Sequence, residues 1–363
     1  MKKLSIIVPV YNMAADGKLE YCIDSLLAQD MAPEEYEIIA VDDASSDNSF
    51  EILREYEKKY PHRITALRSP VNHHQGGAKN IGLAYAEGSW IGFMDADDWA
   101  APRMYGSLLT AAEEAGADMA GCDYHLTDHH GMDIGKVVHN NREDQTGELN
   151  TEKYRKLILD PGSLVVKIYR RELILGDQNS TDRQIEKGTT PRSVKVFPED
   201  IFYEDNAVCK TWMLRAKRFV YLPEPWYYYY QHGGSTVHTI SKKNLEDRKA
   251  AGRLMLEEAK RQNYLETYRP EMEFSFTVLF YINTLFSAMP RSQKIAGRYG
   301  FAKQLAKEMR ETFPAFQENA YYQARIPAEE KKLIAMQMKS HLLFYVYYKL
   351  LWFYRDLRKK TRT

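Results

Sequence analysis

Through about residue 123, short apolar runs rich in β-branched residues alternate with stretches of helical spacing. The runs predict strands at 4–10, 36–41, 63–69, 89–94 and 117–124, with helices between them. Such alternation is typical of βα units arranged around a mostly parallel sheet. We therefore predict an α/β domain whose first strand is buried.

Beyond this region the pattern changes twice. Residues 126–150 and 176–196 are polar and show no clear period, so we predict loops there, with a strand at 164–169 between them. From about residue 241 the chain consists of long amphipathic stretches rich in Leu, Glu, Lys and aromatic residues. We predict two domains, 1–240 and a helical region at 241–363, with the first divided into halves at 1–125 and 126–240.

Charge and cysteine content exclude several classes of protein. Fifty Lys and Arg residues balance fifty Asp and Glu residues among 363, which argues against bulk attraction to nucleic acid. The cysteines, Cys22, Cys122 and Cys209, are too few and too scattered for a disulfide framework. Pro9 interrupts the first apolar run, so no signal peptide is expected. We predict a cytoplasmic protein with no nucleic-acid partner.

Two acidic clusters follow apolar strands. Asp42 and Asp43 come after EIIAV, and Asp95, Asp97 and Asp98 come after WIGFM. Ligands of open α/β sheets bind outside the carboxyl ends of the strands, so both clusters are expected at one edge. Carboxylates gathered there repel one another unless a cation neutralises them, and their oxygens suit Mg²⁺ or Mn²⁺. The alternative is that the acids only cap the helices that follow.

Three segments of the first half carry a family resemblance. SIIVPVYN, VDDASSDNS and QGGAKNIGLAYAEGSWIGFMDADD resemble, in order and spacing, the nucleotide-sugar-binding half of a family 2 glycosyltransferase. GSLVVKIYRREL, FYEDNAV and YYYYQHGGS resemble acceptor-side segments of bacterial polysaccharide and cell-surface members, which extends the similarity to about residue 240. The resemblance implies a GT-A fold, a Rossmann-like mostly parallel sheet flanked by helices, followed here by the α-helical C-terminal region.

The resemblance assigns residues to the donor sugar nucleotide. It implies that Asp43 hydrogen-bonds the uracil and that Asp95 and Asp97 form the DxD pair, with Asp97 ligating Mn²⁺ or Mg²⁺. Family members often carry Arg where this chain has Lys79, for which we expect a phosphate or ribose contact. The expected donor-binding residues are Pro9, Tyr11, Asn12, Asp42, Asp43, Gly76, Gly77, Lys79, Asp95, Ala96 and Asp97.

The resemblance also supplies catalytic and acceptor candidates. Glu204 and Asp205 match the family's ED motif, and we expect Asp205 to be the general base, with Glu204 second; the alternative is helix capping. His232 matches a histidine that binds the metal or the diphosphate, the alternative being an ordinary loop residue. Trp99 is expected to stack on an acceptor sugar, or else to be packed in the core.

The function implied is metal-dependent, inverting transfer of a sugar from a UDP-sugar to a hydroxyl of a glycan or lipid-linked glycan. One alternative is a sugar-phosphate nucleotidyltransferase. Such an enzyme would carry a Gly-rich loop with Arg and Lys after the first strand, where this chain has VPVYNMAADG. A second alternative is a non-catalytic sugar-binding protein of the same fold.

The last helix has two interpretations. Residues 342–354 are largely aliphatic and aromatic, and the basic residues Lys349, Arg355, Arg358, Lys359, Lys360 and Arg362 against Asp356 give a net charge of six minus one, or +5. An apolar face beside a basic tail is typical of an interfacial helix on an anionic membrane, here the inner face of the cytoplasmic membrane. Otherwise the helix packs on its own domain or on the second subunit of a homodimer.

Overall fold

The structure is a computed structural model that describes residues 2–176, 193–231, 240–290 and 295–360, with side chains as far as residue 354. The chain divides into two units, Met1–Gly233 and Gly234–Thr363. The predicted boundary at residue 240 lies a few residues beyond this division.

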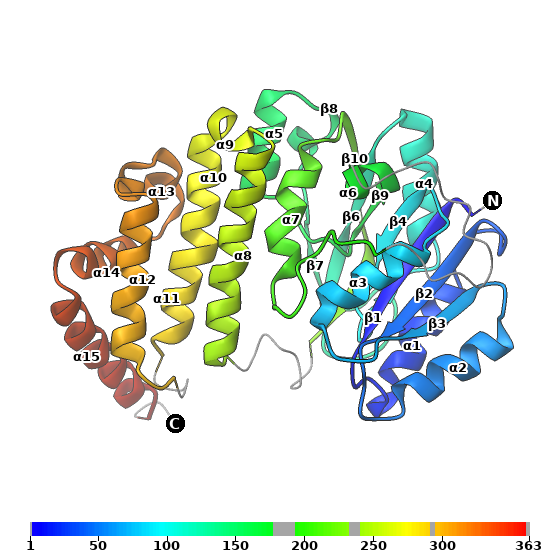
Figure 1. Cartoon of the computed structure of the whole chain (residues 1–363), viewed down its shortest axis with the longest axis horizontal. Coiled ribbons are helices and arrows are strands. Elements are labelled where there is room, and N and C mark those ends of the chain that lie inside the picture. Colours follow the sequence, from blue (N-terminus) through cyan, green and yellow to red (C-terminus); the bar gives the residue numbers. More distant parts are fainter. Residues whose placement is uncertain (1, 177–192, 232–239, 291–294, 361–363) are drawn as a thin grey trace. The chain divides into compact units, whose positions relative to one another are not determined.

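The first unit is built on one mixed sheet (Figure 1). Its first four strands are all parallel: β1 (Leu4–Val10), β2 (Tyr36–Asp42), β3 (Ile64–Arg68) and β4 (Trp90–Phe93). The strands that follow are β5 (Trp99–Ala100), β6 (Met119–Thr127), β9 (Lys167–Arg170) and β10 (Arg218–Tyr230). The order across the sheet is β3-β2-β1-β4-β9-β6-β10-β5, and β9 is antiparallel to both of its neighbours. The sheet is thus parallel in its first half and mixed beyond it.

The strands of the first half follow the apolar runs closely. Every residue of β1, LSIIVPV, is buried, which is typical of a strand covered by helices on both faces. The prediction for 4–10 is confirmed. The prediction for 36–41 differs from β2 by one residue at one end, and those for 63–69 and 89–94 differ from β3 and β4 by one residue at each end. The strand predicted at 164–169 is observed as β9, Lys167–Arg170.

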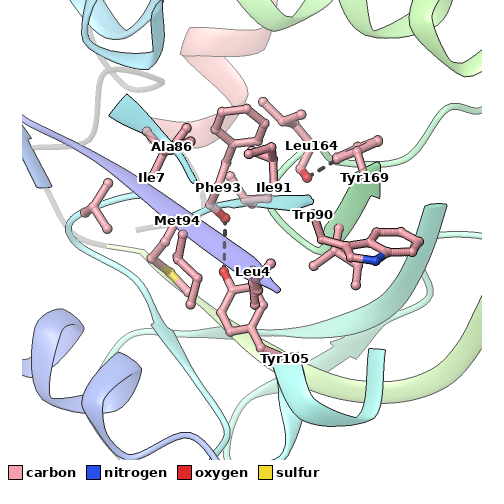
Figure 2. Close-up of a cluster of buried hydrophobic side chains, with 14 of the residues drawn as sticks. Leu4, Ile7, Ala86, Trp90, Ile91, Phe93, Met94, Tyr105, Leu164 and Tyr169 are labelled. Carbon is pink, nitrogen blue, oxygen red and sulfur yellow. Dashed lines mark hydrogen bonds between the residues drawn. The ribbon is translucent and has the colours of Figure 1, made fainter. Parts of the chain in front are cut away.

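Helices α1 (Lys18–Leu27), α2 (Ser49–Lys59), α3 (His74–Tyr85) and α4 (Met104–Ala115) connect these strands. Figure 2 shows part of the core between them, where the hydroxyl of Tyr105 donates to the carbonyl oxygen of Phe93 at 3.3 Å. A Cβ at Gly92 would lie 2.7 Å from the Tyr105 ring. The close contact of α4 with β4 therefore requires glycine at position 92.

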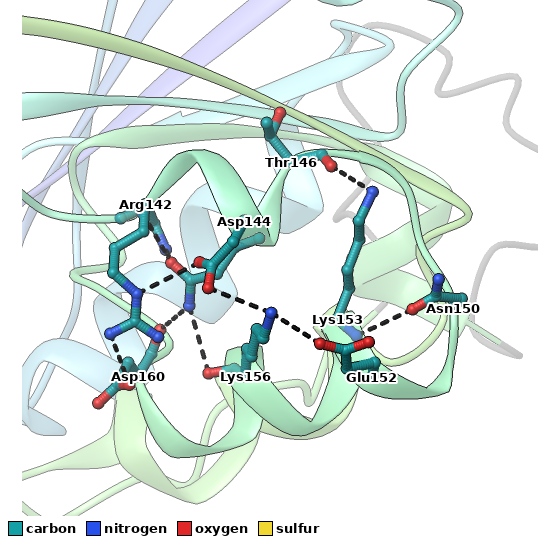
Figure 3. Close-up of polar contacts among 10 residues, drawn as sticks. Arg142, Asp144, Thr146, Asn150, Glu152, Lys153, Lys156 and Asp160 are labelled. Atoms are coloured by element: carbon teal, nitrogen blue, oxygen red, sulfur yellow. Dashed lines mark hydrogen bonds and ion pairs between the residues drawn. The ribbon is translucent and has the colours of Figure 1, made fainter.

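Residues 126–150 are not the plain loop that we predicted. They contain β7 (Lys136–Val138), a 3₁₀ helix (Glu143–Gln145) and β8 (Gly147–Glu148), and they lead into α5 (Thr151–Leu159). Arg142 pairs with Asp144 at 3.3 Å and with Asp160 at 3.2 Å, and Lys156 pairs with Asp144 at 3.1 Å (Figure 3). The segment is ordered by the pairing of β7 with β6 and of β8 with β10, together with polar contacts such as these, so its own sequence shows no apolar period. Most of the second predicted loop, 177–192, lies outside the described residues.

In the described part of the first unit, β9 is followed by α6 (Arg171–Leu175) and α7 (Glu204–Met213). Figure 1 shows α7 beside α3, and a contact between Lys79 and Glu204 joins the two helices.

The second unit is helical, as predicted. It contains α8 (Lys242–Arg261), α9 (Tyr264–Thr267), α10 (Arg269–Phe276), a π-helical turn (Thr277–Ile282), α11 (Asn283–Ala288), α12 (Arg298–Thr312), a 3₁₀ helix (Phe316–Glu318), α13 (Ala320–Arg325), α14 (Ala328–Lys339) and α15 (His341–Lys360). In the described part of the chain, no helix combines the length and the apolar character needed to cross a membrane.

Candidate active site

The carboxyl ends of β1, β2 and β4 meet at one edge of the sheet. The strands are parallel, with Val10 opposite Asp42 and Ile7 opposite Phe93. Asp42 ends β2, and Asp95 comes two positions after the end of β4. The two acidic clusters therefore lie at the same edge, where the sequence placed them.

The residues after β1 shape this edge. Asn12 has a left-handed backbone (φ 54°); its N–H donates to Ser45 Oγ at 2.9 Å, and its Oδ1 accepts from the N–H of Ser46 at 2.8 Å. Pro9 is buried within β1, whereas Tyr11 is 48% exposed. Of these three expected donor residues, Tyr11 presents its side chain to solvent, while Asn12 fixes the loop after β2.

Asp42 and Asp43 are both buried. Asp42 Oδ2 accepts from the N–H of Ser45 and pairs with Arg68 Nε, each at 3.2 Å. Asp43 Oδ1 accepts from the N–H of His73 at 2.9 Å, and burial raises the pKa of this carboxyl. Each carboxylate keeps one buried oxygen, Asp42 Oδ1 and Asp43 Oδ2, with no hydrogen-bond donor among the described residues. These oxygens have the chemistry to accept a ligand N–H or O–H.

The DADD turn places Asp95 among other charges. Its Oδ1 lies 3.5 Å from Gln75 Nε2. Burial raises its pKa, the Lys79 charge lowers it, and the negative charges of Asp97, Glu204 and Asp205 raise it again, to about 7. Ala96, between the two acids, is buried. The DADD and ED motifs, more than a hundred residues apart in sequence, therefore act on each other electrostatically.

Asp98 has a different environment from Asp95 and Asp97, and the sequence did not single it out as structural. It is buried and accepts hydrogen bonds from the Tyr227 hydroxyl and, at 2.8 Å, from the N–H of Tyr230. Burial and the neighbouring acids raise its pKa well above the ordinary value. These hydrogen bonds of Asp98 connect the DADD turn to β10. Both partners belong to the run of four tyrosines after Trp226, which is visible in the sequence.

Trp99 is fully buried in β5. Its Nε1–H donates to the Gly131 carbonyl oxygen at 2.9 Å, its ring stacks on Tyr228 at 5.3 Å, and Tyr21 packs edge-on at 5.0 Å. A sugar cannot stack on a ring that these contacts already cover. The expected acceptor contact of Trp99 is therefore wrong in this structure, and the packing alternative is the observed one.

Lys79 does not point to solvent either. Its Nζ lies 2.5 Å from Oε1 of Glu204, the first residue of α7, so the contact joins α3 to α7. The same Nζ lies 3.0 Å from Gln75 Oε1. Although burial lowers its pKa, the charges of Glu204, Asp95 and Asp205 raise the pKa of Lys79 to about 12. The ammonium is therefore charged and neutralises Glu204.

Asp205 differs from Glu204 in its partners. Its Oδ1 accepts hydrogen bonds from the N–H of Asn206 at 2.7 Å and from Asn206 Nδ2 at 2.8 Å. It lies in the first turn of α7, where the helix dipole favours a carboxylate, and it is only partly buried. Within the ED motif, Glu204 is therefore the carboxylate paired with Lys79, and Asp205 is the one hydrogen-bonded to Asn206.

Gly76 and Gly77 were expected to let the donor approach the backbone. A Cβ at Gly76 would lie 2.0 Å from the Pro198 carbonyl oxygen, and a Cβ at Gly77 would lie 2.3 Å from His73 Cβ. The space is taken by the chain itself. Gly76 permits close packing of α3 against the segment before α7, and Gly77 leaves room for the His73 side chain, so both glycines serve packing within the chain.

That segment, 196–200, is held by two residues that the sequence left without a role. Asn80 is buried; its Oδ1 accepts from the N–H groups of Val196 and Phe197 at 3.0 and 2.9 Å, and its Nδ2 donates to the Phe197 carbonyl oxygen at 2.9 Å. His73 Nδ1 pairs with Asp200 Oδ1 at 2.9 Å, which raises the pKa of the imidazole. Both residues lie in or beside the Gly-rich stretch, and this position was the sequence feature that could have indicated their role.

The site has the donor atoms for a hard divalent cation. The Asp95 carboxyl interacts electrostatically with Asp97, Glu204 and Asp205, and carboxylate oxygens suit Mg²⁺ or Mn²⁺. Among the described residues, no three Asp, Glu, His or Cys side chains form a metal-binding group by themselves, so a cation here would need ligand atoms from elsewhere. His232, the other expected metal residue, lies outside the described residues.

Comparison with known proteins identifies the family. Residues 5–174 match the model of glycosyl transferase family 2. The uncharacterized glycosyltransferase YibD of Escherichia coli is 29% identical over 67% of this chain and 66% of its own length. The poly(ribitol-phosphate) beta-glucosyltransferase of Bacillus spizizenii is 41% identical over 27% of this chain and 15% of its own length. In both cases the match spans less than two thirds of the relative.

A solved structure shares the fold. Residues 1–349 of TarS from S. aureus, in complex with UDP-GlcNAc, superpose with a TM-score of 0.58 at 19% sequence identity, over 93% of this chain and 91% of that one. Together with the parallel strands and the DADD turn at the end of β4, this likeness shows that the chain has the GT-A fold, and residues 5–174 match glycosyl transferase family 2.

Proposed function

We propose that this protein transfers a sugar from a UDP-sugar to a hydroxyl group of a glycan or lipid-linked glycan, with inversion at the anomeric carbon and with a divalent metal. The observation that carries the proposal is that contacts of Gln75 and Lys79 connect the two motifs. Gln75 Nε2 lies 3.5 Å from Asp95 Oδ1, and Lys79 Nζ contacts both Gln75 Oε1 and Glu204 Oε1. Donor-side and acceptor-side carboxylates thereby share one site, as group transfer between two substrates requires.

On the donor side, Asp43 accepts the uracil N–H through its buried Oδ2, which has no donor among the described residues. Tyr11 supplies an exposed aromatic ring at the same edge. Asp97, with Asp95 beside it, would hold Mn²⁺ or Mg²⁺. The ion would offset the negative charge that develops on the departing diphosphate.

On the acceptor side, Asp205 takes the proton of the acceptor hydroxyl. The hydroxyl oxygen forms a bond to the anomeric carbon from the face opposite the diphosphate, the bond to the diphosphate oxygen breaks, and UDP leaves with that electron pair. A single displacement of this kind inverts the anomeric configuration. Glu204, neutralised by Lys79, holds the start of α7 in place.

The comparisons support this reaction class over the alternatives. The matched family is one of glycosyltransferases, which favours sugar transfer over nucleotidyl transfer. Relatives named as poly(ribitol-phosphate) glycosyltransferases favour a polymeric cell-surface acceptor. The TarS structure carries UDP-GlcNAc, which favours a UDP-linked donor here.

The proposal is tested with the full-length chain in two steps. Thermal melting with UDP, GDP and ADP, with and without Mn²⁺, should show the largest upward shift for UDP with metal, because a ligand that binds only the native state stabilises it. UDP release from UDP-glucose and UDP-N-acetylglucosamine then reports turnover, and NMR of the product reports its anomeric configuration. A larger melting shift with GDP than with UDP would contradict the UDP-sugar donor. A product with retained anomeric configuration would contradict the inverting mechanism. UDP binding without transfer to any acceptor would favour the non-catalytic alternative.

We place this activity in the cytoplasm, at the inner face of the membrane.

A further inference from the structure

Helix α15 carries an unusual concentration of exposed apolar side chains. Seven of the fourteen large hydrophobic residues that are exposed in the described part of the chain belong to it, with Leu342 and Leu350 each 62% exposed. The seven, which we call the α15 face, are Leu342, Leu343, Val346, Tyr347, Leu350, Phe353 and Tyr354.

The α15 face is continuous along the helix. At 3.6 residues per turn its members fall within an arc of about 140°. On the other side, Phe344 and Tyr348 are buried, and the ring centroids of Tyr348 and Phe286 of α11 are 6.4 Å apart. His341 Nε2 contacts the Tyr299 carbonyl oxygen of α12 at 3.0 Å. The helix is therefore anchored in its own unit by one side, and the α15 face is not needed for that packing.

The charges around the α15 face indicate what covers it. The sequence from Lys349 to Arg362 holds six basic residues and one acid, Asp356, a net charge of six minus one, or +5. A second copy docked on the same face would bring another basic segment with no matching acids. Anionic lipid headgroups would neutralise these charges, and acyl chains would cover the apolar arc.

The dimensions favour a helix that lies on a bilayer. The α15 face runs from Leu342 to Tyr354, about 18 Å at 1.5 Å per residue, against a hydrocarbon core about 30 Å thick. Aromatic residues such as Tyr347 and Phe353 are common where a protein meets the boundary between headgroups and acyl chains.

We propose that α15 is an interfacial helix that docks the protein on an anionic membrane through Leu342, Leu343, Val346, Tyr347, Leu350, Phe353 and Tyr354, together with the basic residues from Lys349 onward. The docking does not depend on sugar transfer. If the acceptor is lipid-linked, confinement to the membrane raises its effective concentration at the site.

The test is co-sedimentation of the full-length chain with vesicles, in the absence of any substrate. We expect binding to vesicles that contain phosphatidylglycerol and little binding to phosphatidylcholine alone. Binding should fall between about 0.1 M and about 1 M salt, because the screening length shortens from about 10 Å to about 3 Å. Absence of binding at low salt, or equal binding to both vesicles, would overturn the proposal.

Variants separate the two components. Leu350→Gln with Phe353→Gln removes apolar surface, and Arg358→Gln with Lys359→Gln and Lys360→Gln removes charge. Each should reduce binding by at least about tenfold. Leu254→Gln, at an exposed leucine of α8, is the matched control and should bind as the parent does. Thermal melting confirms that each variant is folded.

The competing occupant has a distinct outcome. If the α15 face instead joins two copies, light scattering will show a dimer that Leu350→Gln with Phe353→Gln converts to a monomer, and the parent chain will not sediment with vesicles. Those two results together would show that the α15 face binds a second copy of the chain and not a membrane. Unchanged vesicle binding by the apolar variant would also overturn the assignment of the α15 face.

Discussion

Lys79 of α3 and Glu204 of α7 form an ion pair with 2.5 Å between Nζ and Oε1, and both side chains are buried. The pair connects the Gly-rich stretch after β3 to the ED motif, across 125 residues of sequence. It fixes the start of the helix that carries Asp205 next to the DADD turn. A buried salt bridge therefore joins the two motifs that form the candidate site.

Breaking this pair should be costly. Lys79→Met leaves the Glu204 carboxylate buried without its cation, so we expect a loss of about 3–5 kcal/mol in the free energy of unfolding, measured by urea denaturation. Lys79→Met combined with Glu204→Leu removes both charges and should cost less than Lys79→Met alone. If the double variant loses as much free energy of unfolding as Lys79→Met and Glu204→Leu together, the two side chains do not stabilise the fold through their ion pair.

The two acids of the ED motif should separate in kinetics. Asp205→Asn removes the proposed base and should lower transfer by at least about 100-fold. Its affinity for UDP, measured by calorimetry, should not change. Glu204→Gln is the matched comparison, because it alters the neighbouring carboxylate that Lys79 neutralises. If Asp205→Asn transfers normally while Glu204→Gln does not, the base is Glu204.

Two neighbouring carboxylates of the DADD turn should behave differently. Asp97→Ala should abolish the effect of Mn²⁺ on UDP affinity, because it removes the proposed metal ligand. Asp98→Asn should keep metal-dependent UDP binding but lower the melting temperature, because Asp98 accepts hydrogen bonds from Tyr227 and Tyr230. Calorimetry with and without Mn²⁺ distinguishes the two. Equal UDP affinity of Asp97→Ala and the parent chain, with Mn²⁺ present, would contradict the metal assignment.

The contact between His73 and Asp200 should depend on pH. The hydrogen bond to Asp200 raises the pKa of His73, so the folded chain holds this proton more tightly than the unfolded chain. The resulting stabilisation is present below about pH 6.5 and is lost as the pH rises through the raised pKa. Asp200→Asn should therefore lower the melting temperature at about pH 5.5 and change it little at about pH 8.5. An equal effect at both values would exclude the ion pair.

Glycine is needed at Gly76 because a side chain there would clash with the backbone of a neighbouring segment. A Cβ there would lie 2.0 Å from a backbone oxygen of Pro198, so Gly76→Ala should destabilise the fold by about 1–3 kcal/mol in urea denaturation. Gly300→Ala is the control. Nothing lies within 4 Å of its Cβ position in α12, and alanine should stabilise that helix by about 0.5–1 kcal/mol. Equal effects of the two substitutions would mean that packing against Pro198 is not limiting.

The sequence by itself determined the first four strands and the edge at which Asp42, Asp43, Asp95 and Asp97 gather. Apolar runs such as SIIVPV identify buried parallel strands, and residues that directly follow such strands must lie at their carboxyl ends. The resemblance to a family followed from the motifs in the same segments and from their order. These features are read along the sequence and need no knowledge of tertiary contacts.

Only the tertiary structure decided the partners of Lys79, Gly76 and Trp99. Each was expected to touch a substrate, and each instead contacts a distant part of the chain: Glu204, Pro198 and Tyr228. The short strands β7 and β8 were missed for the same reason, since each is paired with a strand, β6 or β10, that carries the apolar pattern. A side chain's type fixes what it can bind, but its partner depends on which distant segments the fold brings within a few ångströms.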